Sequence, residues 1–189
     1  ELKMTPLQTL ALYNAVANNG VLLKPQFVKY IKKGSIVQQE FEPKILNSSI
    51  CSKSTLKDLK EMLSAGIRAP DHGMLRPWRI LAIQGESLKK LGNLFADAKQ
   101  EKDPEAPPMI LEKLRNNPLR APLILGVCAI VSNESKIPEI EQVLSAGAVA
   151  QNILNAAHAL GYGAIWRTGE MAYDDRVKTG LGLSRPDKI

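Results

Sequence analysis

The sequence predicts an α+β protein, in which helices flank an antiparallel or mixed sheet beside one long central helix. Three observations support this class. The run Leu123–Val131 has no polar side chain until Ser132, which is typical of a strand buried on both faces. A second β-like run, Trp78–Ile83, ends at Gly85. The alanine-rich stretch Glu139–Leu160 has the length and composition of a long helix.

The first fifty-odd residues predict an additional helix and hairpin. A helix is expected over Met4–Asn18, because Pro6 occupies its favoured first position and the apolar residues follow helical spacing. Asn19-Gly20 is expected to end it in a left-handed turn. Two short β-like runs, Gln26–Ile31 and Ser35–Phe41, then resemble the two strands of a hairpin.

The remaining elements follow from capping residues and prolines. Thr55, with Asp58 three residues later, resembles a capping box and is expected to begin a helix. Pro70 ends that helix, because the residue before a proline disfavours helical geometry. The other predicted elements are a helix over Ser87–Ala98, a third strand over Gly163–Thr168 and a last helix over Tyr173–Leu181.

Composition and charge restrict the class of protein. Hydrophobic residues make up 44% and charged residues 23%, which is typical of a globular protein with a core. The net charge of +6 is diffuse and aromatic residues make up only 5%, so we expect no nucleic-acid partner. This charge suits a small anion such as a phosphorylated cofactor. Cys51 and Cys128 lie far apart, which indicates neither a disulfide framework nor a metal site, and Cys128 is expected to be buried.

The sequence contains no recognisable targeting or membrane segment. It begins at Glu1 without a charged and then apolar signal segment. No uninterrupted apolar run approaches the roughly 18 residues that are needed to span a bilayer. We therefore expect a cytoplasmic protein without a membrane partner.

Two parts of the chain resemble two different families. The segments Met4–Gln8, Ala17–Val21 and Ile50–Leu56 are similar to part of a penicillin-binding transpeptidase domain, between its Ser-x-Asn and Lys-Thr-Gly elements. From about Leu56 onward the chain resembles the small, single-domain NAD(P)H-dependent branch of the nitroreductase family. The segments that carry this second resemblance, in matching order and spacing, are Ala65–Gly73, Leu75–Arg79, Pro118–Ile124, Ser145–Gly147 and Ala156–Thr168.

The two resemblances imply a chimeric chain. A penicillin-binding-transpeptidase-like fragment covers residues 1–55, a truncated nitroreductase-like FMN domain covers residues 56–189, and their junction lies within residues 55–64. The nitroreductase resemblance implies that family's α+β sheet and long interface helix, incomplete at both ends. It also implies a homodimer with FMN at the interface.

The nitroreductase resemblance implies FMN as cofactor, NAD(P)H as electron donor and a small nitro or quinone-like molecule as acceptor. It places Arg68, His72, Trp166, Arg167 and Thr168 at FMN, with Arg167 on the phosphate. Flavin chemistry requires cationic donors at the phosphate and a positive or N–H group beside the reduced ring. Taken by themselves, the same residues fit a helix-capping arginine, a surface histidine, a core tryptophan and a solvated strand end.

The same resemblance places the nicotinamide nucleotide at the end of the long helix. The residues concerned are Ala156, Ala157, His158, Ala159, Leu160 and Gly161. His158 considered alone is typical of a histidine on a helix face. Because hydride transfer requires no acid or base from the protein, we assign no catalytic residue, and we assign no metal ligand.

The chain departs from the nitroreductase pattern at both ends. The N-terminal Arg-Arg-Ser element that grips the FMN phosphate is absent, and Lys32-Lys33-Gly34-Ser35 imitates it only loosely. The strand and tail expected after Ile189 are absent too. A catalytically inactive fusion of fragments therefore stays open as a second interpretation. A penicillin-binding transpeptidase is a third, although the Ser-x-x-Lys matches at Ser54 and Ser87 follow the Thr-Pro-Leu-Gln helix instead of preceding it.

Overall fold

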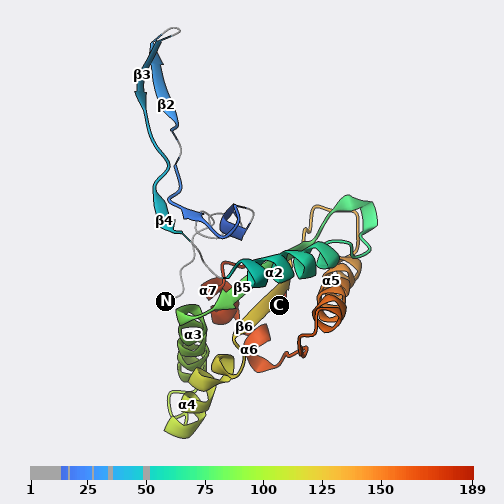
Figure 1. Ribbon diagram of the computed structural model, residues 1–189. Coiled ribbons are helices and arrows are strands. Elements are labelled where there is room, and N and C mark those ends of the chain that lie inside the picture. The colour runs from blue at the N-terminus through green and yellow to red at the C-terminus, as the bar shows by residue number, and fades with distance from the viewer. Residues whose placement is uncertain (1–13, 17, 27, 34–35, 49–51) are drawn as a thin grey trace. The chain divides into compact units, whose positions relative to one another are not determined.

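The computed structural model describes residues 14–16, 18–26, 28–33, 36–48 and 52–189 (Figure 1). The chain separates into two compact units, which divide between Glu61 and Met62. Within the described ranges, no helix combines the length and the hydrophobicity that crossing a membrane would require.

The unit before residue 61 contains two short antiparallel strand pairs. The strands β1 (Leu22–Leu23) and β4 (Ile45–Asn47) form one pair, which the sequence did not indicate. The strands β2 (Tyr30–Lys33) and β3 (Ile36–Glu40) form the other, and they confirm the expected hairpin. Its first strand begins later than the expected Gln26.

The expected N-terminal helix, Met4–Asn18, lies mostly outside the described residues, as does Cys51. Of its described residues, 14–16 are helical, whereas Asn18 already belongs to the following turn. Asn19 and Gly20 have φ angles of 51° and 85°, which confirms the left-handed turn that follows.

A two-stranded antiparallel sheet forms the centre of the unit over residues 62–189. The strands β5 (Trp78–Gln84) and β6 (Leu123–Ala129) pair without a register shift, from Trp78 opposite Ala129 to Gln84 opposite Leu123. Both strands confirm the sequence prediction. Because successive side chains point to opposite faces, each strand contributes to two separate hydrophobic clusters.

Two helices pack on one face of the sheet. These are α5 (Glu139–Ala159), which confirms the predicted long helix, and the last turn of α2 (Lys53–Gly66). A Cβ placed on Gly66 would lie only 2.9 Å from Cγ1 of Ile153, so α2 and α5 approach each other closely. The buried cluster on this face comprises Met62, Ala69, Ile80, Val149, Ile153 and Ala157.

The other face of the sheet is covered by α3 (Glu86–Lys102) and α7 (Asp175–Gly180), so that β5 and β6 lie between α3 and α5 (Figure 1). Cys128 is fully buried there, as predicted, and burial raises the pKa of its thiol to about 12. The first five residues of β6 are only partly buried, so the expectation of a strand buried on both faces holds only at its end. The buried cluster comprises Leu81, Ile83, Leu88, Leu91, Leu94, Ala98, Cys128, Val177 and Leu183.

The helix borders differ from the sequence prediction in physically clear ways. The helix α2 begins at Lys53, earlier than the expected cap at Thr55. Ser52 caps it instead, because its hydroxyl oxygen accepts a hydrogen bond from the backbone N–H of Thr55 at 3.1 Å. Two further elements, α4 (Pro108–Asn116) and the 3-10 helix η2 (Asn117–Arg120), lie in a region for which no element is predicted.

The prediction of a third strand over Gly163–Thr168 is wrong. No described strand pairs with these residues, and all of them are exposed. A strand needs a neighbour whose backbone groups bond to its own, and hydrophobic runs cannot supply that neighbour by themselves. The segment is therefore an exposed connection without regular secondary structure.

The predicted last helix, Tyr173–Leu181, corresponds to α7, which begins two residues later and ends one residue earlier than expected. The short helix α6 (Glu170–Tyr173) ends where Asp174 adopts an extended backbone with φ −75° and ψ 125°. Oδ1 of Asp174 then accepts a hydrogen bond from the backbone N–H of Val177 at 3.0 Å. Asp174 is thus the N-cap of α7. Because an N-cap residue has a non-helical backbone, no continuous helix can run through Asp174.

Candidate functional site

The loop after α2 carries two of the residues that the sequence places at FMN. Arg68 follows the last turn of α2 and is exposed. His72 begins the 3-10 turn η1 (His72–Met74). Between them, Ala69 is buried in the cluster beneath α5, which anchors the start of the loop to the core.

Asp71 shapes this loop. Its Oδ2 accepts a hydrogen bond from the backbone N–H of Arg76 at 2.7 Å. Gly73, Met74 and Arg76 have positive φ angles of 68°, 55° and 49°. Because a left-handed backbone costs a non-glycine residue about 1–2 kcal/mol, contacts with the surroundings and not local preference hold the loop in this form.

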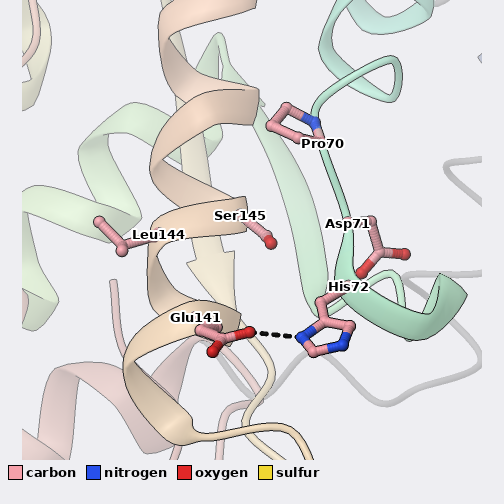
Figure 2. A pocket seen from close by; sticks show the side chains of 6 residues that line it. All are labelled: Pro70, Asp71, His72, Glu141, Leu144 and Ser145. Atoms are coloured by element: carbon pink, nitrogen blue, oxygen red, sulfur yellow. Dashed lines mark hydrogen bonds and ion pairs between the residues drawn. The ribbon is translucent and has the colours of Figure 1, made fainter.

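His72 connects the loop to the first turn of α5. Its Nδ1 lies 2.5 Å from Oε2 of Glu141 (Figure 2). Both side chains stay partly exposed, at 64% for His72 and 43% for Glu141. Glu141 is not among the site residues expected from the sequence, because 69 residues separate it from His72 and no local spacing relates the two.

A pocket of about 380 Å³ lies between the loop and α5, within the size range of small-molecule sites. Figure 2 shows the side chains of Ser145 and His72 on its two sides. Two carboxylates, Asp71 and Glu141, give it an acidic lining. Oδ1 of Asp71 is buried and has no hydrogen-bond partner among the described residues. The lining residues are Pro70, Asp71, His72, Glu141, Leu144 and Ser145.

Glu141 and Ser145 are four residues apart and therefore lie on one face of α5. That spacing is visible in the sequence, but it does not reveal which segment the face meets. Within the described part of the chain, no group of three or more side chains could hold a metal ion.

Trp166 also lies against α5. A Cβ placed on Gly147 would be 3.7 Å from Cη2 of Trp166, an ordinary van der Waals distance. Trp166 is 54% exposed, so its interpretation as a core residue is wrong. Arg167 and Thr168, the next two residues of the same connection, are exposed. Among the described residues, neither Arg68 nor Arg167 has an ion-pair partner.

The segment predicted to contact the nicotinamide nucleotide lies at the end of α5. Ala157 is 4% exposed and belongs to the core cluster, with Ala156 and Leu160 packed against it. His158, Ala159 and Gly161 are exposed. Only the exposed side of this segment is accessible to a ligand.

Comparison with protein families identifies two matching regions. The model of the nitroreductase family matches residues 53–189. The model of the penicillin binding protein transpeptidase domain matches residues 2–78. The two matches overlap over residues 53–78, which include α2.

Individual relatives agree with the first of these matches. The chain is 36% identical over 137 residues to YdjA of Escherichia coli (strain K12), which is named as a candidate NAD(P)H nitroreductase. This match covers 71% of this chain and 73% of the relative. It is 32% identical over 134 residues to a candidate NAD(P)H nitroreductase of Haemophilus influenzae, covering 70% and 72%.

Solved structures show the same fold. A nitroreductase-like family protein from Bacillus cereus superposes with a TM-score of 0.58 at 21% identity, covering 93% of this chain and 80% of that chain. A nitroreductase with bound FMN from Bacteroides fragilis gives a TM-score of 0.52 at 21% identity, covering 70% and 72%. With the family match over residues 53–189 and the identities above, these findings establish that the chain belongs to the nitroreductase family.

Proposed function

We propose that the nitroreductase-like part of the chain is an FMN-dependent NAD(P)H oxidoreductase that reduces small nitro or quinone-like acceptors. One structural observation carries the proposal beyond family membership. Two segments that the sequence places at FMN, which are far apart in the chain, both lie against α5. His72 contacts Glu141, and Trp166 lies over Gly147. At about 1.5 Å of rise per residue, these two contacts are about 9 Å apart along the helix axis.

The charges of the described residues fit FMN in one orientation. The acidic lining of the pocket, from Asp71 and Glu141, opposes a phosphate there. The guanidinium groups of Arg68 and Arg167 lie outside this lining and have no ion-pair partner within the described ranges. An unpaired guanidinium suits a phosphate, since it presents several donors in a fixed plane. We therefore propose that Arg68 or Arg167 binds the phosphate of FMN, and that the uncharged part of FMN lies at the pocket.

Bound FMN supplies the two-electron chemistry that links NAD(P)H to the acceptor. The residues of this chain would bind and orient it. His72 offers a ring nitrogen beside the pocket, Trp166 offers a flat apolar surface, and the arginines offer positive charge. The exposed side of residues 158–161 is the proposed contact of the nicotinamide nucleotide.

Visible absorption of the purified full chain is the first test. We expect the absorption bands of an oxidised flavin, either as purified or after incubation with FMN and removal of the excess. NADH or NADPH should then be oxidised in the presence of a nitroaromatic or a quinone. A protein that stays colourless after incubation with FMN would contradict the proposed activity.

The transpeptidase match supports a second candidate, a fusion of fragments without catalysis. We propose that residues 1–55 and 56–189 derive from the two families. Support comes from the overlap of the two family matches and from the division of the compact units between Glu61 and Met62. Normal FMN affinity and NAD(P)H oxidation would exclude the inactive fusion. Covalent labelling by a fluorescent β-lactam would instead indicate transpeptidase chemistry.

We also propose that the protein forms a homodimer. Two large apolar side chains of α5, Ile140 and Leu144, are 63% and 64% exposed. Trp166 is exposed as well and lies against Gly147 of the same helix. Exposed apolar groups of this size mark interaction surfaces. Light scattering after size-exclusion chromatography should give twice the mass of one chain, and the mass of a single chain would contradict the proposal.

A further inference from the structure

The contact between His72 and Glu141 restricts where the imidazole carries its proton. Nδ1 of His72 lies 2.5 Å from Oε2 of Glu141. An ionised carboxylate only accepts hydrogen bonds, so Nδ1 must be the donor. This holds for the neutral ring and for the imidazolium alike, because the imidazolium carries a proton on both nitrogens. In the neutral ring this contact leaves Nε2 without a proton, whereas in the imidazolium Nε2 carries one as well.

The second ring nitrogen is available to a ligand. Figure 2 shows it on the side of the ring turned away from Glu141. Nε2 has no hydrogen-bond partner among the described residues, and His72 lines the pocket. In the neutral ring Nε2 accepts a hydrogen bond, and in the imidazolium it donates one.

We propose that Glu141 is a positioning residue, which holds His72 with its proton on Nδ1 and presents Nε2 to the ligand of the pocket. The identity of that ligand, the uncharged part of FMN, rests on the proposed function. The position of the proton does not, since it follows from the contact itself.

The surroundings favour a positioning role over a stabilising one. Both partners are more than one-third exposed, and exposed ion pairs contribute little to folding. The loop is held independently, by the burial of Ala69 and by the hydrogen bond from Arg76 N to Asp71. Loss of the Glu141 carboxylate should therefore release the imidazole without unfolding the loop.

Glu139 provides a matched control. It lies in the same first turn of α5, and its Oε1 is 3.2 Å from Nζ of Lys188 instead of His72. Both glutamates interact with the same helix dipole. Glu139→Leu and Glu141→Leu therefore remove the same charge from the same turn, and only the second removes the partner of His72.

Long-range ¹H–¹⁵N spectra of the imidazole nitrogens test the proton position without FMN. The sequence contains only two histidines, so His158→Gln assigns the signals. The wild-type protein should show His72 protonated on Nδ1. This signature should disappear in Glu141→Leu and persist in Glu139→Leu. A wild-type spectrum with the proton on Nε2 alone, or one unchanged in Glu141→Leu, would overturn the proposal whether or not FMN binds.

FMN titration then tests the positioning role. Glu141→Leu should weaken FMN binding about tenfold, the effect of losing one hydrogen bond. Glu141→Gln should recover part of the affinity, because its amide oxygen still accepts from Nδ1–H, and Glu139→Leu should leave it unchanged. A pure charge effect predicts the opposite, since removing a negative charge favours an anion. Equal or tighter FMN binding in both Glu141 variants would overturn the proposal. A wild-type protein that binds no FMN would contradict the proposed function, and the ¹H–¹⁵N spectra alone would then test the role of Glu141.

Discussion

The side-chain amide of Gln142 pairs with the backbone of Ser132, accepting a hydrogen bond from its N–H at 2.9 Å and donating one to its carbonyl at 3.1 Å. The same amide nitrogen donates to the carbonyl of Ile137 at 2.8 Å. Gln142 is 1% exposed and lies in the first turn of α5. It thereby binds the connection after β6 to the turn that carries Glu141.

Replacing Gln142 by Leu should destabilise the protein. The change leaves backbone groups of Ser132 and Ile137 without partners in a partly buried place, which costs about 3 kcal/mol in unfolding free energy. Urea denaturation measures it. Gln151→Leu is the control, because Gln151 is exposed and its side-chain amide donates a hydrogen bond to the exposed side chain of Asn155 at 3.0 Å. If both changes lowered the unfolding free energy equally, the hydrogen bonds of Gln142 would not hold the connection between β6 and α5.

Gly92 allows α3 to approach α4 closely. A Cβ on Gly92 would lie 2.0 Å from the backbone oxygen of Arg115, which cannot move without displacing α4. Gly92→Ala should therefore lower the unfolding free energy by about 3 kcal/mol. Gly126→Ala in β6 is the control, since its Cβ would meet Leu81 at an ordinary 3.6 Å. Thermal unfolding should separate the two variants clearly, and similar melting temperatures would contradict the close approach.

Gly73 tests the loop that carries His72. Its φ is 68°, and a Cβ there would lie 2.8 Å from Cδ1 of Ile137. Gly73→Ala should cost about 1–2 kcal/mol through backbone strain and should also weaken FMN binding by shifting His72. Gly85→Ala also places a side chain at a positive φ, 56°, but meets no described neighbour within 4 Å and should leave FMN binding unchanged. FMN titration of both variants decides whether the loop position matters.

The acid stability of the protein should depend on Asp174. Burial raises the pKa of this carboxyl, but the ion pair with Nζ of Lys102 at 2.6 Å and the N–H of Val177 outweigh burial, so the pKa lies below its ordinary 3.8. The unfolded state then takes up the proton first. The stabilisation is complete above about pH 5 and disappears as the pH falls through the native pKa.

Two variants of Asp174 separate its charge from its capping role. Asp174→Asn keeps an oxygen for Val177 N–H and should lose about 1–2 kcal/mol at pH 7, with a shallower decline of stability below pH 4 than the wild-type protein. Asp174→Ala also removes the cap and should lose about 1 kcal/mol more. Chemical denaturation between pH 3 and 7 measures both. A decline as steep in Asp174→Asn as in the wild type would assign the acid sensitivity to other groups.

The arginines should determine FMN affinity. Removal of a charge-assisted hydrogen bond costs about 1.5–3 kcal/mol, which is about 10- to 150-fold in Kd. We expect a loss of this size for Arg68→Ala or Arg167→Ala, whichever contacts the phosphate. Arg120→Ala, at an exposed position in η2, is the control. If neither site variant differs from this control, the phosphate is not held by these arginines.

The family, the two central strands and the long helix could all be predicted from the amino-acid sequence. Leu123–Val131, Trp78–Ile83 and Glu139–Leu160 are specified by local hydrophobic pattern and composition, and the structure confirms each as an element. The family follows from segments that match in order and spacing along the chain. All of these signals come from residues that are near one another in the sequence.

Which distant segments are in contact could be learned only from the three-dimensional fold. Gly163–Thr168 has the composition of a strand but no pairing partner among the described residues. The buried cap at Asp174 starts the last helix two residues after the start that periodicity predicts. Glu141 lies beside His72 because α5 packs on the sheet with that face toward the loop. Contacts of this kind depend on how distant elements pack, and local periodicity and capping contain no information about that packing.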